Sequence, residues 1–267
     1  MTLSLIRSRK IIGMIHLHAL PGTPRYAGDI NKIVEKAVEE AVVYRNSGID
    51  MIALENMHDV PYLNREVGPE VVAAMTRAAI EVKRETQLPC GLQILAGANK
   101  AALAVALAAG LDFVRAEGFV FGHLSDEGWM NSDAGELMRY RKTIGAQNIP
   151  VFADIKKKHS AHAMSSDVSI EDTAKAAQFF MTDGVVITGP ATGEAIDLEE
   201  LKRVREAVDV PVLVGSGVTP ENVLECLQLA DALIVGSWFK RDGFWANEVD
   251  PERVRIFMKK VKVHRNK

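Results

Sequence analysis

The sequence predicts one domain of the α/β class, a (β/α)8 TIM barrel that spans residues 1–267. Three observations predict it. Short apolar runs alternate with amphipathic stretches eight times along the chain. The length of 267 residues is typical of one such barrel. The loops that follow the apolar runs are often long, whereas the loops that precede them are short. Eight βα units in strict order give a closed parallel barrel with its helices outside.

The apolar runs are predicted to be buried parallel strands. They cover residues 11–17, 51–56, 91–95, 113–119, 150–155, 185–188, 212–214 and 233–235. The stretches between them are predicted to be helices, since their apolar residues form one stripe; in the first, Ile33, Ala37 and Ala41 lie on it and Glu35 and Glu39 outside it. These helices cover residues 31–46, 69–85, 100–109, 134–144, 170–181, 198–207, 222–229 and 251–262.

The loops differ in length at the two ends of the predicted barrel. Helix-to-strand connections such as 110–112 and 183–184 are minimal, whereas the strand-to-helix connections 18–30, 57–68 and 157–169 are long. Long loops after the strands mark the face of a barrel where ligands bind. The sequence therefore predicts a site at the carboxyl ends of the strands.

The composition excludes several classes of protein. With 48% apolar and 25% charged residues, the chain is typical of a globular protein with a large core. A net charge of −3 and the lack of a basic stripe argue against a nucleic-acid partner. No apolar run reaches transmembrane length, so no membrane span is predicted. A homo-oligomer stays open, because barrels of this kind can pair through their outer helices.

The predicted compartment is the cytoplasm. Cys90 and Cys226 are too few for a disulfide framework and indicate buried thiols in a reducing compartment. The segment 7–10 has three cationic residues and no acidic one, as transit peptides do. Because the first predicted strand begins at residue 11, a removable presequence of usual length has no room. Organellar targeting by this short basic segment stays open.

The seventh and eighth predicted strands both end in Gly-Ser. One continues as Gly215-Ser216-Gly217-Val218 and the other as Gly236-Ser237. Glycine lets main-chain N–H groups approach a ligand closely, and phosphates usually bind after strands seven and eight of such barrels. The sixth strand ends in Thr188-Gly189 and can add to this cradle. We therefore expect a small phosphorylated ligand here.

Polar residues at the other strand ends are the candidate catalytic and binding residues. Burying a polar side chain in a barrel interior costs free energy, so such residues are expected where they have a function. Asp154 and Lys156 share a face, so the carboxylate can hold the ammonium, and a desolvated lysine can act as a base or form a Schiff base. Glu55-Asn56 ends the second strand. Arg115 and Glu117 share a side of the fourth, either as a structural ion pair or as a substrate clamp.

The first strand ends in His16-Leu17-His18, which gives a second interpretation. Both imidazoles lie on one side of the strand and can bind a metal or transfer protons. Together with Asp154 they would form the ligand set of a metal-dependent hydrolase. The ends of strands six and eight supply no further metal ligand, and a structural histidine is the third possibility. No cofactor is firmly implied, and a divalent metal stays an alternative.

Six blocks of sequence stand out together: 13–17 with 20–22, 55–56 with 59–61, 139–141, 153–159, 188–189 with 192–193, and 214–218 with Asn222. With these blocks the chain resembles one known family, the BtpA family, which includes SgcQ-like proteins. The resemblance implies a β/α barrel of the ribulose-phosphate-binding type. It also implies two settings, since a cyanobacterial member is linked to photosystem I biogenesis and the SgcQ-like members accompany sugar-transport genes. The family has no agreed catalytic residues to carry over.

The sequence thus predicts an enzyme that acts on a small phosphorylated metabolite, either a phosphosugar or a nucleotide-like molecule, by lyase or isomerase chemistry. Asp154, Lys156, Glu55 and His16 would share the acid, base and oxyanion roles. Asn56, Arg115 and Glu117 would contact the ligand. The alternatives are the metal-dependent hydrolase and a non-catalytic assembly factor.

Overall fold

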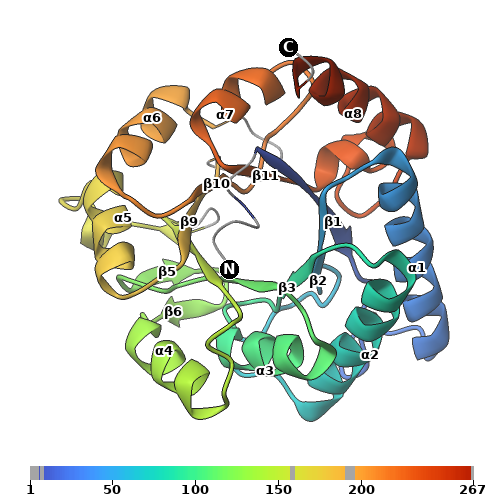
Figure 1. Ribbon diagram of the computed structural model, residues 1–267. Helices are drawn as coiled ribbons and strands as arrows, with labels where there is room; N and C mark the ends of the chain where they lie inside the picture. The colour runs from blue at the N-terminus through green and yellow to red at the C-terminus, as the bar shows by residue number, and fades with distance from the viewer. Residues whose placement is uncertain (1–5, 7–8, 157–159, 190–195, 266–267) are drawn as a thin grey trace.

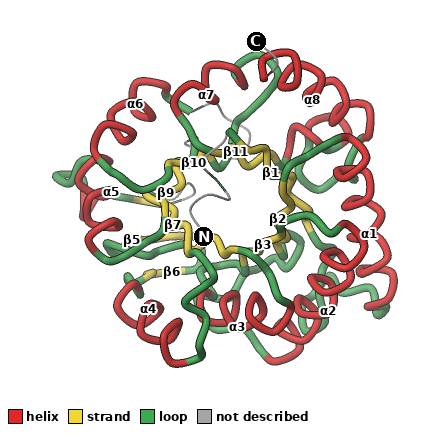
Figure 2. Tube along the Cα trace, viewed as in Figure 1, coloured by secondary structure: helices red, strands yellow, loops and turns green. Residues whose placement is uncertain are grey.

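Eight parallel strands close into a barrel in the computed structural model, which describes residues 6, 9–156, 160–189 and 196–265 (Figure 1). The order around the barrel is β1-β11-β10-β9-β7-β4-β3-β2, which confirms the predicted fold class. Figure 2 shows the strands as an inner ring enclosed by the helices. The strands are β1 Lys10–His16, β2 Met51–Glu55, β3 Cys90–Gln93, β4 Phe113–Ala116, β7 Val151–Ile155, β9 Gly184–Ile187, β10 Val212–Val214 and β11 Ala232–Val235.

One helix follows each barrel strand and packs outside it. The helices are α1 Ile30–Ser47, α2 Pro69–Thr86, α3 Asn99–Ala109, α4 Ala134–Thr143, α5 Ile170–Phe179, α6 Leu198–Ala207, α7 Val223–Leu229 and α8 Pro251–Arg265. Side chains fix several starts: Asp29 accepts hydrogen bonds from the first turn of α1, and Asp197 does the same for α6. These eight helices were all predicted, with ends that differ by at most three residues.

Strand alternation divides the side chains between an outer and an inner core. Outward residues such as Ile52 and Leu54 pack against the helices. Inward residues such as Met14, Phe113 and Phe152 fill the barrel itself. At the carboxyl ends of the strands the inward positions change from apolar to polar, for example from Ala53 to Glu55 on β2. The apolar layers thus form a floor beneath a polar layer.

A second, three-stranded antiparallel sheet lies outside the barrel, in the order β6-β5-β8. Its strands are β5 His123–Ser125, β6 Gly128–Met130 and β8 Ser160–Ala161. They belong to the loops after β4 and β7, where the sequence predicts no regular structure. These segments have two or three residues each, too short to show an alternating pattern.

Within the described parts of the chain, no helix is both long and apolar enough to cross a membrane. Cys90 and Cys226 are buried free thiols, as predicted. Two segments of the recognition blocks, 157–159 and 192–193, lie outside the described residues.

Candidate active site

A cavity of about 410 Å³ opens at the carboxyl ends of the strands. The residues that line it come mainly from β1, β2, β4, β10, β11 and the loops that follow them. Arg253 of α8 joins them from outside the barrel wall. The sequence-predicted residues in its wall are His16, Glu55, Arg115, Glu117, Gly215, Ser216, Gly217, Val218, Gly236 and Ser237.

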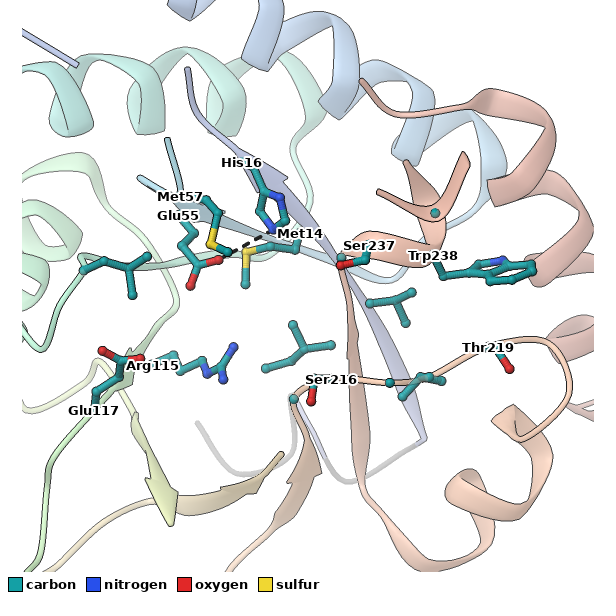
Figure 3. A pocket seen from close by; sticks show the side chains of 18 of the residues that line it. Met14, His16, Glu55, Met57, Arg115, Glu117, Ser216, Thr219, Ser237 and Trp238 are labelled. Carbon is teal, nitrogen blue, oxygen red and sulfur yellow. Dashed lines mark ion pairs between the residues drawn. The ribbon is translucent and has the colours of Figure 1, made fainter. Parts of the chain in front are cut away.

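His16 and Glu55 lie side by side at the ends of β1 and β2, where they are paired in register (Figure 3). Nδ1 of His16 is 2.8 Å from the carbonyl oxygen of Trp245. Because a carbonyl only accepts, Nδ1 carries the hydrogen, and Nε2 is the atom that faces Glu55, 3.6 Å from its Oε2. Gly236 makes room for this ring, since a Cβ there would be 3.2 Å from Nε2. Nε2 and the Glu55 carboxylate are therefore close enough to interact electrostatically, although 3.6 Å is longer than a hydrogen bond.

Arg115 and Asp154 form a buried ion pair across β4 and β7. Nε and Nη2 of the guanidinium donate to the two carboxylate oxygens at 2.8 and 2.9 Å. Burial alone would lower the pKa of Arg115, but the charges of Asp154, Glu55 and Glu117 outweigh burial and raise it. Gly215 leaves space beside the guanidinium, because a Cβ there would be 3.1 Å from Nη2. Arg115 is thus a fixed cation in the cavity wall.

Glu117 extends the acidic side of the cavity. Its Oε2 accepts a hydrogen bond of 3.1 Å from the N–H of Gly97, and its main chain is bound on both sides by Asn99. The hydroxyl of Tyr62 donates to the Met57 carbonyl at 2.7 Å. Burial and then the nearby carboxylates, Glu55 and Glu117 first among them, raise the pKa of this phenol. The carboxylates of Glu55 and Glu117 therefore create a negative potential that extends to Tyr62 in the neighbouring wall.

The loops after β10 and β11 form the opposite side, where Asp242 lines the cavity beside main-chain groups. Gly217 has φ +69°, a left-handed conformation that favours glycine, and its carbonyl accepts a hydrogen bond of 2.9 Å from Asn222. The Ser216 hydroxyl accepts one from the Gly189 N–H at 2.9 Å, so the sixth-strand loop supports the cradle. Among the described residues, no protein group accepts from the main-chain N–H groups of Gly217, Val218, Ser237 and Trp238.

Arg253 approaches this side of the cavity from α8. Its guanidinium stacks on the Trp238 ring, 4.0 Å from the ring centroid, and its Nε donates to the Trp238 carbonyl at 2.6 Å. Figure 3 shows Ser216, Ser237 and Trp238 on one side of the cavity and Glu55, Arg115 and Glu117 on the other. Four main-chain N–H groups and one guanidinium are suited to an anion.

Lys156 lies elsewhere than the sequence suggests. It has φ +48°, and its Nζ donates to the Val168 carbonyl at 2.6 Å. The expected contact between Lys156 and Asp154 is replaced by the Arg115–Asp154 pair, because the left-handed residue ends the strand alternation on which that expectation rests. Asp154 and Lys156 instead border a second hollow of about 10 Å³, room for one water molecule.

The three predicted metal ligands do not come together. His18 is exposed and its ring packs against His58, with centroids 5.5 Å apart. Asp154 uses both oxygens on Arg115, and His16 uses Nδ1 on a carbonyl. Within the described residues, no group of three or more His, Cys, Asp or Glu side chains is arranged to hold a metal ion.

Asn56 and Thr188 lie beside the cavity rather than in its wall. The Asn56 amide donates to Asp59 at 2.8 Å and accepts from the Leu95 N–H at 2.7 Å, so it joins the loops after β2 and β3. The Thr188 hydroxyl is buried and has no hydrogen-bond partner within the described chain. The contacts of Asn56 and Thr188 within the protein do not test whether either residue binds a ligand, so both roles stay predictions.

The sequence reasoning missed several wall residues. Arg253 reaches the cavity from a helix far along the chain, and the Trp245 carbonyl, from a late loop, contacts His16 in the cavity wall; no local pattern marks either residue. Asp126 and Glu127 come from the turn between β5 and β6. Tyr62 could have been suspected, because it lies in the long loop after β2.

A closed barrel with a cavity at the carboxyl ends of its strands defines a TIM-barrel protein with a candidate ligand site. The chain belongs to the BtpA family, whose sequence model matches residues 7–263. It is 48% identical to an uncharacterized mitochondrial protein of Caenorhabditis elegans, over 94% of this chain and 92% of the relative. It is also 32% identical to the photosystem I biogenesis protein BtpA of Synechocystis, over 93% and 86%. The predicted family is confirmed.

Solved structures show the same fold at low sequence identity. The phosphoribosyl anthranilate isomerase of Thermus thermophilus has a TM-score of 0.59 at 14% identity, covering 96% of this chain and 99% of that one. The thiamine phosphate pyrophosphorylase of Pyrococcus furiosus has a TM-score of 0.57 at 14% identity, covering 97% and 98%. At such identities the likeness extends to the fold alone.

Proposed function

We propose that this protein is an enzyme that binds a small phosphorylated metabolite and moves a proton on it, as a lyase or isomerase does. One observation carries the proposal: a single cavity of about 410 Å³ joins a cradle of main-chain N–H groups to a buried histidine–carboxylate pair. The fold neighbours named for phosphoribosyl anthranilate and thiamine phosphate support it at the level of the fold.

The phosphate would bind on the side formed by β10 and β11. The N–H groups of Gly217, Val218, Ser237 and Trp238 can donate to its oxygens, and Arg253 can neutralise part of its charge. This arrangement agrees with the usual phosphate position of such barrels, after strands seven and eight.

Proton transfer would use His16 and Glu55. Nε2 of His16 is unprotonated in the neutral ring, because Nδ1 holds the hydrogen for the Trp245 carbonyl, so Nε2 can take a proton from the substrate. Glu55, at 3.6 Å, would stabilise the resulting imidazolium. Arg115 would stabilise negative charge that develops on a substrate oxygen. Asp154 would position Arg115, and the proton-transfer role first predicted for Asp154 and Lys156 stays a prediction.

A thermal-shift screen with phosphosugars and nucleotides tests the proposal. A bound ligand stabilises the folded state by about 3 kcal/mol at a hundredfold excess over its dissociation constant, so the melting temperature should rise. Gly217→Val should abolish the rise, because valine strongly disfavours the left-handed backbone of this position. If no phosphorylated compound raises the melting temperature, the proposal is wrong.

The named function of the Synechocystis relative favours a second candidate, a non-catalytic assembly factor. A strain that lacks its own family member separates the two candidates. Rescue by wild-type protein and equally by His16→Gln and Glu55→Gln would favour the assembly factor. Rescue by wild-type protein alone would favour the enzyme.

A further inference from the structure

The cavity has an apolar floor beneath the His16–Glu55 pair and the N–H cradle. Met14 lies two residues before His16 on β1, and Ile234 lies two residues before Gly236 on the neighbouring β11. Strand alternation therefore places both side chains one layer below the mouth of the barrel. Both are buried residues that line the cavity, and Figure 3 shows Met14 beside both members of the pair. The floor is thus formed by one thioether and one aliphatic side chain.

A second apolar surface forms a side wall of the cavity. Met57 and Tyr62, from the loop after β2, pack with Leu95, which follows β3, in one small hydrophobic cluster. All three residues line the cavity. Hydrogen bonds hold this wall in place, because the Tyr62 hydroxyl donates to the Met57 carbonyl at 2.7 Å and the Leu95 N–H donates to Asn56 at 2.7 Å. The side wall is therefore a built surface rather than a loose loop.

Neither the floor nor the side wall offers a ligand a free hydrogen-bond donor. Their side chains hold a single N–H or O–H group, the Tyr62 hydroxyl, and that group already donates to the Met57 carbonyl. A sugar carries a hydroxyl on nearly every ring carbon, and each hydroxyl buried against these side chains would lose its water without gaining a partner. An apolar ring leaves no polar group unpaired there and removes apolar surface from water.

The charged groups around the mouth are already engaged within the protein. Arg115 donates to both oxygens of Asp154. Glu117 accepts a hydrogen bond of 3.1 Å from a main-chain N–H, and Glu55 lies 3.6 Å from Nε2 of His16. The protein thus does not depend on substrate hydroxyls to satisfy these buried groups.

We propose, on the basis of the function proposed above, that the substrate is a phosphate ester whose organic part contains an apolar ring rather than a polyhydroxylated sugar. With its phosphate on the N–H cradle, the ring lies on the apolar floor and against the side wall. A ring suits both surfaces, because it can contact the floor with a face and the side wall with an edge. The carbon from which a proton is removed then lies near His16 and Glu55.

Isothermal titration calorimetry with a matched pair of probes tests the inference. Cyclohexyl phosphate and myo-inositol 1-phosphate are monoesters on the same carbon ring and differ only in the hydroxyl groups of that ring. With EDTA present, wild-type protein should bind cyclohexyl phosphate at least about tenfold more tightly. Met57→Gln and Leu95→Asn each put an amide on the side wall and should lower this preference to about threefold or less. Met181→Gln is the matched control and should keep it, because Met181 is 70% exposed in the connection from α5 to β9, at the other end of the barrel.

The other outcomes separate the ring from the phosphate site. Equal affinity for the two esters, or tighter binding of the inositol ester, overturns the apolar ring and leaves the proposed function standing. If Gly217→Val binds cyclohexyl phosphate as tightly as wild-type protein does, the ring binds elsewhere and the inference is wrong. No binding of either ester or of inorganic phosphate overturns the proposed function itself.

If the side-wall variants unfold, titrations of wild-type protein at several temperatures still decide. Burial of apolar surface makes the heat-capacity change of binding negative, so this change should be more negative for cyclohexyl phosphate than for the inositol ester. Equal heat-capacity changes would contradict burial of the ring on the floor and side wall.

Discussion

The carbonyl of Trp245 accepts a hydrogen bond of 2.8 Å from Nδ1 of His16, which fixes both the tautomer and the direction of the ring. The loop that contains Trp245 is itself anchored on both sides to Glu40 of α1. Lys240, 1% exposed, donates to Glu40 of α1 at 2.8 Å, and the other Glu40 oxygen accepts from the Val249 N–H at 2.8 Å. A buried ion pair therefore anchors the segment that orients the proposed catalytic histidine.

Breaking this anchor should destabilise the protein strongly. Lys240→Met leaves the Glu40 carboxylate buried without its cation, which costs about 3–5 kcal/mol. The double variant Glu40→Gln, Lys240→Met should regain at least half of that loss, because no charge is left unpaired. Urea unfolding of the three proteins measures both changes. A loss below about 1 kcal/mol for Lys240→Met would show that the pair is not an anchor.

Arg115 and Asp154 should behave as one unit, and Lys156 should behave separately. Asp154→Asn removes the charge that holds the buried guanidinium and should lower the free energy of unfolding by about 3 kcal/mol. Lys156→Met removes one half-buried hydrogen bond, to Val168, and should cost about 1 kcal/mol. Affinity for a phosphorylated ligand should fall in the first variant and stay within twofold in the second. Equal effects on affinity would instead support the role first predicted for Lys156.

The glycine at the end of β11 should be required for the position of His16. Gly236→Ala places a Cβ 3.2 Å from Nε2, so the His16 ring must shift by a few tenths of an ångström. We expect catalytic activity to fall at least about tenfold while the free energy of unfolding changes by less than about 2 kcal/mol. Gly135→Ala in α4 is the control; alanine is the better helix residue, and activity should be unchanged. Unchanged activity in Gly236→Ala would remove His16 from the proposed mechanism.

His58 should make stability depend on pH. Burial, helped by His18, Lys240 and Arg25, lowers its pKa from 6.5 to about 4. The unfolded chain then binds more protons than the folded one between pH 6.5 and 4, so stability is lost as pH falls through this range, by up to about 3 kcal/mol.

His58→Gln should remove that part of the pH dependence. Asp133, whose pKa burial raises to about 6, acts in the opposite direction but is present in both proteins, so it cancels in the comparison. Urea unfolding at several pH values between 4 and 7 gives the two curves. If the free energies of unfolding of the two proteins change in parallel with pH, the pKa of His58 is not lowered in the folded state.

Much of the fold and part of the site could be predicted from the sequence, and strand periodicity is the reason. An apolar run that ends in a polar residue at an inward position identifies His16, Glu55 and Arg115 without any structure. The two Gly-Ser strand ends lie in the cavity wall for the same reason. These inferences need only the alternation of one strand and the order of strands in a barrel.

The rest depends on contacts that periodicity does not encode. Arg115 and Asp154 come from β4 and β7, and their pairing depends on side-chain reach across two strands. Lys156, which has a left-handed backbone just beyond the end of β7, donates to the Val168 carbonyl rather than to Asp154. Trp245 orients His16 through its main-chain carbonyl. Because every residue has such a carbonyl, the sequence does not mark this position. Cellular compartment, oligomeric state and the absence of a nucleic-acid partner stay predictions.

A crystal structure of the protein with a bound phosphate ester tests the central claim most directly. We predict phosphate oxygens within about 3 Å of the N–H groups of Gly217, Val218, Ser237 and Trp238, with the organic part of the ligand against His16 and Glu55. A phosphate held outside this cradle, or against the carboxylates of β2 and β4, would contradict the account.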